Sequence, residues 1–259
     1  MDGEDGKHLA ETLQTLNEVP PWSARINTAG FLVQPAPGSL LRGDDNKASP
    51  FDVSHAVRRH LTTAVDHLGC LIVLLGAVKL VPMYAPFTLL RAALENACGA
   101  IWLLDPSQRP ERLARRFRLA LADVHHNEEA KQLAGQRGPR TEQERKDQIH
   151  DIAHRAGIDD AALKGSTSYS AIVRAVDQSG QADNLFEVAW KLCSAYAHGD
   201  MWATLSSSAL TPIPGATEPG HGNFKVEASV STLKYMTTVA VMATRRAWEL
   251  HDLRCQPPY

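Results

Sequence analysis

The chain has 259 residues, of which 44% are hydrophobic and 22% charged, and its formal net charge at pH 7 is −2. This composition suits a protein with a sizeable core, and the charge excludes the strongly basic field that drives indiscriminate nucleic-acid binding. No CxxC pair occurs, and free thiols in apolar runs behave as small buried groups, so a reducing, cytoplasmic location is expected. The cysteines are Cys70, Cys98, Cys193 and Cys255.

The first 50 residues alternate short helical pieces with proline and glycine breakers, which predicts an irregular N-terminal arm wrapped on the rest of the chain. The breakers are Pro20, Pro21, Pro35, Pro37, Gly38 and Gly43.

Apolar residues at helical spacing predict three long helices in the next part of the chain. The first covers 54–81 and ends before Pro82. Its apolar run from 68 to 78 has 11 residues, which is too short to span a bilayer. The other two helices cover 86–105 and 110–134 and begin at prolines, which tolerate the first turn of a helix.

The remaining segments are shorter and more polar. Residues 135–165 are polar, with a charged helix expected in the middle, and two further helices are predicted over 168–178 and 184–198. Proline and glycine predict a flexible loop over 211–223, and the FKVEASV that follows is a short strand or an extended lead-in. A last helix is predicted over 231–253.

With strands nearly absent, the pattern predicts an all-α fold, namely a single-domain bundle of four or five long helices. Residues 1–50 are the expected arm and residues 51–259 the expected bundle domain.

Arg91 and Glu95 are the most informative polar residues, because they lie four apart on one side of an otherwise apolar helix. An unpaired buried charge costs several kcal/mol, so each must pair with the other or with another helix. His198 is the natural partner, since it ends a helix whose other face is apolar. The set is either a structural network or a functional site.

Lys191, Ser194 and His198 align on one side of the helix that ends before Gly199. With Arg91 and Glu95 they are the candidate catalytic residues; alternatively, Lys191 is simply solvated. Tyr196, Trp102 and Trp202 are candidate substrate-binding aromatic residues, although aromatic residues at helical spacing are more often part of a core.

The RxxxE pair followed about a hundred residues later by SxxxH resembles bacterial helical proteins of unknown function and, more distantly, the HEPN superfamily of nucleotide-binding helical domains. That resemblance covers residues 54–250. It implies a helical bundle that forms homodimers, and a metal-independent ribonuclease of a toxin or defence system. The superfamily signature is an arginine four to six residues before a histidine; before His198 the nearest cation is Lys191, with six residues between them.

In such an activity the histidine removes the proton of the ribose hydroxyl or protonates the leaving oxygen, while a cation stabilises the charge on phosphorus. The expected partner is therefore RNA. Arg115 and Arg116, in a run that also includes Arg112 and Arg118, are candidates for a basic wall beside the site, or else one solvated helix face.

A second hypothesis is a metal site, since DxxH occurs at Asp123/His126, Asp147/His150 and Asp151/His154. The polar surroundings of the last two pairs favour a solvated surface instead of a metal site. A further alternative is a site in which His60 and His67 point at Glu95. No cofactor or metal is expected.

The third hypothesis is a binding or regulatory bundle with a small-molecule ligand in a pocket between helices, over which 211–223 acts as a lid. No membrane partner is expected. The chain carries no phosphate-binding loop, nucleophile elbow or dinucleotide fingerprint, which argues against the enzymes that use them.

Overall fold

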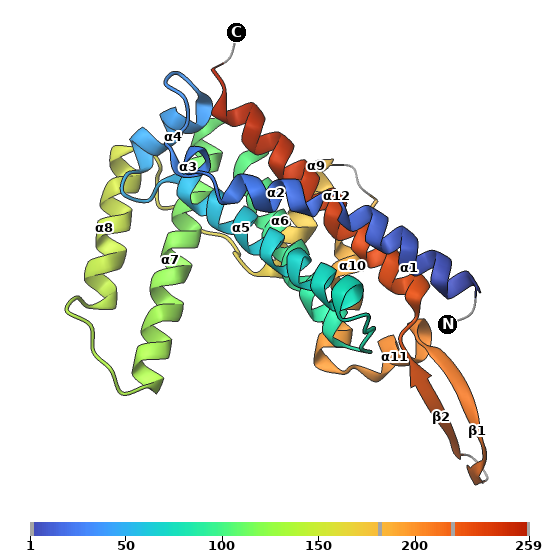
Figure 1. Cartoon of the computed structure of the whole chain (residues 1–259). Coiled ribbons are helices and arrows are strands. Elements are labelled where there is room, and N and C mark those ends of the chain that lie inside the picture. Colours follow the sequence, from blue (N-terminus) through green and yellow to red (C-terminus); the bar gives the residue numbers. More distant parts are fainter. Residues whose placement is uncertain (1–2, 181–182, 219–220, 258–259) are drawn as a thin grey trace.

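The computed structural model describes residues 3–180, 183–218 and 221–257, and it is mostly helical with one small antiparallel hairpin (Figure 1). This confirms a helical protein, but with more helices than the four or five expected. The helices are α1 (Gly3–Leu16), α2 (Val19–Ile26), α3 (Ala29–Leu32), α4 (Leu40–Ala48), α5 (Val53–Ile72) with its π-helical extension η1 (Val73–Ala77), α6 (Ala85–Leu104), α7 (Arg109–Leu133), α8 (Glu142–Arg155), α9 (Tyr169–Gly180), α10 (Leu185–His198), α11 (Met201–Ser207) and α12 (Val230–Cys255).

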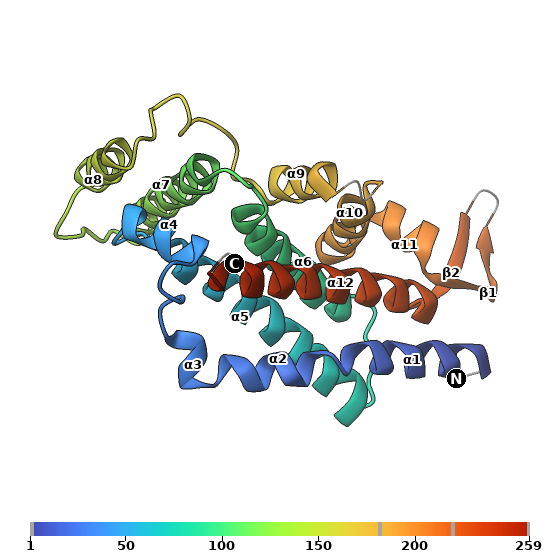
Figure 2. The same ribbon diagram turned by 90° about the horizontal axis from the view of Figure 1, so that it is seen from above.

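Helix α6 is the centre of the core. It packs against α5 and α12, and also against α9 and α10 (Figure 2). Leu94, Ala97 and Ile101, on successive turns, are all buried. A helix that is apolar on nearly every side can be stable in water only when neighbours surround it, and α6 is surrounded as its sequence predicts.

The N-terminal arm is more regular than expected, since its short helical pieces are the four helices α1 to α4, and it packs on the rest of the chain as predicted. Helix α1 packs along α12, and α2 and α4 pack against α5 (Figure 2). Pro20 and Pro21 stand in the first turn of α2, where a missing amide costs nothing, so they start a helix instead of preventing one. Leu16 and Leu41 are buried in the same core as α6.

Helices α7 and α8 form a helical hairpin that extends from one end of the bundle (Figure 1). The charged helix expected within 135–165 is α8. It begins with a capping box, in which Thr141 and Glu144 satisfy each other's backbone amides. Ile149 and Ile152 are buried, and the rest of α8 is mainly polar.

Of the segment expected to be a loop over 211–223, residues 211–218 and 221–223 lie in the strands of a β-hairpin, and residues 219–220 lie outside the described residues. Strand β1 (Ala209–Glu218) pairs antiparallel with β2 (His221–Glu227), and Ala209 lies opposite Glu227. The hairpin projects away from the helices (Figure 1), so its position does not support a lid over the bundle. The alternation in FKVEASV was the part of the sequence that indicated a strand.

Two helical stretches, Val53–Ala77 and Ala85–Leu104, are long and apolar enough to cross a membrane by length and composition alone. The second is the central helix of the core, and such helices meet this criterion in soluble proteins as well. The first stretch is longer than the 11-residue apolar run at 68–78 because the helix begins well before that run. The expected absence of a membrane partner stays a prediction.

Candidate functional site

Helix α6 brings Arg91 and Glu95 together one turn apart. The Arg91 Nε–H donates to Glu95 Oε1 at 2.8 Å, and the Glu95 side chain is only 10% exposed against 24% for Arg91. The guanidinium therefore supplies the charge that the buried carboxylate needs, as predicted from the cost of an unpaired charge.

His198 joins this pair from a position 107 residues later in the chain. The Arg91 Nη1 atom lies 3.1 Å from His198 Nε2. A guanidinium has no acceptor, so it donates to Nε2, and a neutral imidazole then carries its proton on Nδ1. The predicted convergence of Arg91, Glu95 and His198 is confirmed, but the imidazole is exposed at the edge of the core and not in its middle.

The end of α10 fixes the position of His198. Gly199 follows at φ +73°, in the left-handed region that favours glycine, and the amide of Asp200 donates to the Ala195 carbonyl at 2.8 Å. The predicted glycine stop is thus confirmed, and His198 lies in the last turn of its helix.

Trp190 completes the cluster, and the sequence reasoning missed its role. Its Nε1–H donates to the same Glu95 Oε1 at 2.7 Å, and the Arg91 guanidinium lies 5.9 Å from its ring centroid. Trp190 is eight residues before His198, on the same side of α10. The signal that was available is that a tryptophan facing a core needs an acceptor for its N–H.

Ser194 and Lys191 do not join the cluster. Ser194 lies one turn before His198 and is half-buried, and no hydrogen bond of its hydroxyl is recorded among the described residues. The Lys191 ammonium lies 3.3 Å from Glu187, one turn back along α10, and its side chain is 58% exposed. Glu187 also accepts from Arg174 at 2.8 Å, so Lys191 belongs to a separate ion cluster with Glu187 and Arg174.

The three predicted substrate-binding aromatic residues lie in different environments. Tyr196 is buried, stacks on Phe87 at 4.1 Å and bonds Ser208 through its hydroxyl. Trp202 is 54% exposed on α11. Trp102 is buried eleven residues beyond Arg91 on α6, roughly 16 Å along the helix. Of these, only Trp202 offers a free face.

The arginine run at the start of α7 does not form the expected basic wall or the solvated face. Arg115 bonds Glu111 at 2.8 Å and the Trp102 carbonyl at 2.6 Å. Arg116 is buried, donates to the Asp52 carbonyl, and burial lowers its pKa to about 10. The run ties α7 to its neighbours because the long side chains of arginine reach carbonyls and carboxylates that a short loop leaves unpaired.

Two thiols near the cluster are buried, which disfavours the thiolate form that acts as a nucleophile. Cys193 is buried on α10, and burial raises its pKa to about 12; burial raises the pKa of Cys98 as well. The expectation that the cysteines in apolar runs are buried holds for both, but Cys70 is exposed on α5.

A cavity of about 530 Å³ lies on the other side of Glu95. His60 lines it, and its Nδ1–H donates to Asn96 Oδ1 at 2.9 Å. Burial lowers the pKa of His60, so the ring is neutral and its Nε2 lone pair has no partner among the described residues. His60 and Glu95 thus share one cavity, as one of the metal alternatives required, while His67 does not line it.

The cluster itself is poorly suited to a metal ion, because its one carboxylate accepts from Arg91 and Trp190, and a guanidinium stands beside the imidazole. The DxxH pairs do not pair internally either. Asp123 lies 3.5 Å from Arg59, and Asp147 accepts from Gln143.

The arrangement at the end of α10 therefore offers an exposed imidazole, a cation held in place beside it, and a buried carboxylate and a half-buried indole that orient the cation. This combination suits proton transfer at a site where negative charge develops. Comparison of the chain with family models, with curated proteins and with solved structures finds no match.

Proposed function

We propose that the chain is a metal-independent endoribonuclease, similar to HEPN-like proteins, in which His198 and Arg91 form the active site of a homodimer. The observation that carries the proposal is the 3.1 Å approach of the Arg91 guanidinium to the exposed His198 imidazole. A role in a toxin or defence system follows from the resemblance of the RxxxE and SxxxH motifs.

The chemistry uses each group of the cluster. When RNA binds, the Arg91 N–H moves from His198 Nε2 to a phosphoryl oxygen, and the freed Nε2 takes the proton of the ribose 2′-hydroxyl, which attacks the adjacent phosphorus. The bond from phosphorus to the 5′-oxygen breaks, and the imidazolium gives its proton to that leaving oxygen. Arg91 stabilises the negative charge that develops on the phosphoryl oxygens. Glu95 and Trp190 are positioning residues, because they hold the guanidinium through its Nε–H and through the shared carboxylate oxygen. RNA is the fitting substrate because it carries its own nucleophile, so no metal is needed to activate water.

The test is cleavage of an end-labelled single-stranded RNA by the purified protein in excess EDTA. The expected products end in a 2′,3′-cyclic phosphate, and a DNA oligonucleotide of the same sequence stays intact because it lacks the 2′-hydroxyl. Intact RNA, dependence on added metal, or equal cleavage of the DNA would contradict the proposal.

The second candidate function, a small-molecule-binding bundle, is favoured by the cavity beside Glu95. His60, whose buried Nε2 has no hydrogen-bond partner among the described residues, lines this cavity, and Ser166 and Ser168 just before α9 add hydroxyl groups. The fitting ligand is a small molecule with hydrogen-bond donors, and a rise in melting temperature with such a ligand is the expected result.

Gly99 tests the packing of this cavity. A Cβ at this position would lie 2.8 Å from Cε1 of His60 and 3.0 Å from its Nδ1. Since the ring is buried and bonded to Asn96, Gly99→Ala is expected to lower the free energy of unfolding by about 1–3 kcal/mol in urea denaturation.

Gly69→Ala is the matched control, because Gly69 also lies in a helix but an added Cβ meets nothing within 4 Å. This control is expected to gain about 0.5–1 kcal/mol. Equal effects of the two substitutions would show that His60 moves aside freely and is not held by its surroundings.

A further inference from the structure

Helix α8 and the segment after it gather two imidazoles and a carboxylate at one point. His150 and His154 are one turn apart on α8, and Asp160 follows the helix. Asp160 Oδ1 lies 2.8 Å from His150 Nδ1 and 3.0 Å from His154 Nε2. The three ligand atoms all lie within 4.8 Å of one another, and within the described ranges no other group of histidine, cysteine or acidic residues does so.

The backbone after α8 fixes the position of Asp160 beside the two histidines. Gly157 adopts φ +82° after α8 and turns the chain back, and Ile158 is buried, which anchors the turn. Asp159 then accepts from the amide of Ala162 at 2.8 Å, and Arg118 donates to the Ala162 carbonyl at 2.8 Å. Asp160 thus stands between two fixed points, so little ordering is required when it binds a ligand.

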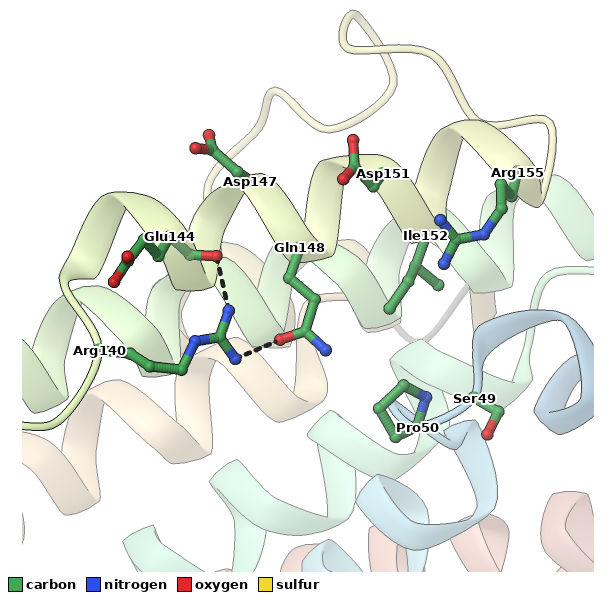
Figure 3. A pocket seen from close by; sticks show the side chains of 9 residues that line it. All are labelled: Ser49, Pro50, Arg140, Glu144, Asp147, Gln148, Asp151, Ile152 and Arg155. Carbon is green, nitrogen blue, oxygen red and sulfur yellow. Dashed lines mark hydrogen bonds between the residues drawn. The ribbon is translucent and has the colours of Figure 1, made fainter.

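The two DxxH pairs of α8 that suggested a metal site, Asp147/His150 and Asp151/His154, do not supply the carboxylate of this cluster. Asp147 and Asp151 line a shallow pocket between α8 and the turn at Ser49 and Pro50, and Figure 3 shows both side chains directed away from that turn. Neither has an ion pair with His150 or His154 among the described residues. The carboxylate comes from beyond the helix, which a DxxH pattern does not anticipate.

We propose that His150, His154 and Asp160 form a binding site for one divalent ion of the zinc class. Two histidines four apart on a helix are a recurrent zinc-binding pair, and an Asp oxygen is a common third ligand. Ligand bonds of about 2.0–2.2 Å place tetrahedral ligand atoms roughly 3.3–3.5 Å apart. The two separations between Asp160 and the histidines, 2.8 and 3.0 Å, need to open by about 0.3–0.7 Å, which the exposed Asp160 side chain allows.

The chemistry selects the ion. Imidazole nitrogens disfavour Mg²⁺ and Ca²⁺, which prefer oxygen ligands, and the absence of a thiolate in the set disfavours Cu⁺. Three protein ligands leave the fourth position to water, since the side chains of His154 and Asp160 are 50% and 62% exposed. The bound ion would fasten the segment after α8 to the helix. This site lies on α8, apart from the Arg91–His198 cluster on α6 and α10.

The test is calorimetric titration of the full chain, without a polyhistidine tag and after dialysis against a chelator, with zinc chloride. One ion per chain is expected, with a rise in melting temperature that EDTA reverses. Co²⁺ in place of Zn²⁺ is expected to give the intensified visible bands of a four-coordinate site. His154→Ala and Asp160→Asn are each expected to weaken binding roughly 10- to 100-fold.

His126→Ala is the matched control, because His126 is an exposed histidine on α7 that also faces a carboxylate, with its Nδ1 3.8 Å from Glu129. It is expected to leave the titration unchanged. Binding that is absent in the unaltered chain, or that survives His154→Ala and Asp160→Asn together, would overturn the proposal. Because His126, His154 and Asp160 are exposed, circular dichroism of these variants is expected to match that of the unaltered chain.

Discussion

Arg112→Met is expected to lower the free energy of unfolding by about 3–5 kcal/mol, because it leaves a buried carboxylate without its main partner. Arg112 and Asp44 are 1% and 0% exposed. The Arg112 Nε–H and Nη2–H donate to the two Asp44 oxygens at 2.6 and 2.9 Å. Arg112 also donates through Nη1 to the carbonyls of Pro106 and Ser107, so one side chain joins α4, α7 and the turn before α7.

The measurement is urea denaturation of Arg112→Met, Asp44→Leu and the double variant. The double variant is expected to lose less stability than the sum of the single variants, since it removes both charges together. Arg245→Met is the matched control, because Arg245 forms a similar two-pronged pair with Glu18 whose side chains are 46% and 37% exposed. Exposed pairs contribute about 0–1 kcal/mol, so a similar cost for Arg112→Met would contradict the structural role assigned to it.

The arginine run illustrates what the sequence could not reveal. Four arginines within seven residues are consistent with a solvated helix face, a basic wall or a set of internal ties. Only the position of Asp44, 68 residues earlier, decides that Arg112 is internal. The prediction that the N-terminal arm is irregular was wrong for a related reason. A proline breaks the interior of a helix but can also begin one, and packing against α5 and α12 determines which of the two occurs.

The contact among Arg91, Glu95 and His198 was predictable because the free-energy cost of burying an unpaired charge leaves few possible arrangements. A charged pair on a helix that is apolar all round has to be neutralised, and a histidine before a glycine stop ends its helix in a defined place. The contact between Trp190 of α10 and the Glu95 carboxylate could not be predicted, because it depends on how α6 and α10 are rotated relative to each other. No local sequence pattern contains that information. Asp160 was missed likewise, because a turn of the chain brings it back to α8.

His198→Ala is expected to reduce the rate of RNA cleavage by about 10²–10⁴-fold, the typical contribution of a positioned general acid or base. The side chain is exposed in the last turn of α10, and its one recorded hydrogen bond is to Arg91. Its removal therefore leaves the core intact, and the midpoint of urea denaturation is expected to stay nearly constant. A loss of activity with an unchanged midpoint separates a catalytic role from a structural one.

His55→Ala is the matched control, because His55 is an exposed histidine on α5 outside the cluster, and it is expected to retain full activity. Arg91→Lys keeps the positive charge but loses the fork that serves Glu95 and His198 together, so a loss of about 10²–10³-fold is expected if the guanidinium stabilises the phosphoryl charge. If His198→Ala instead lowers the denaturation midpoint and leaves cleavage untouched, the network of Arg91, Glu95, Trp190 and His198 fixes the register of α6 against α10. The nuclease site would then have to lie elsewhere.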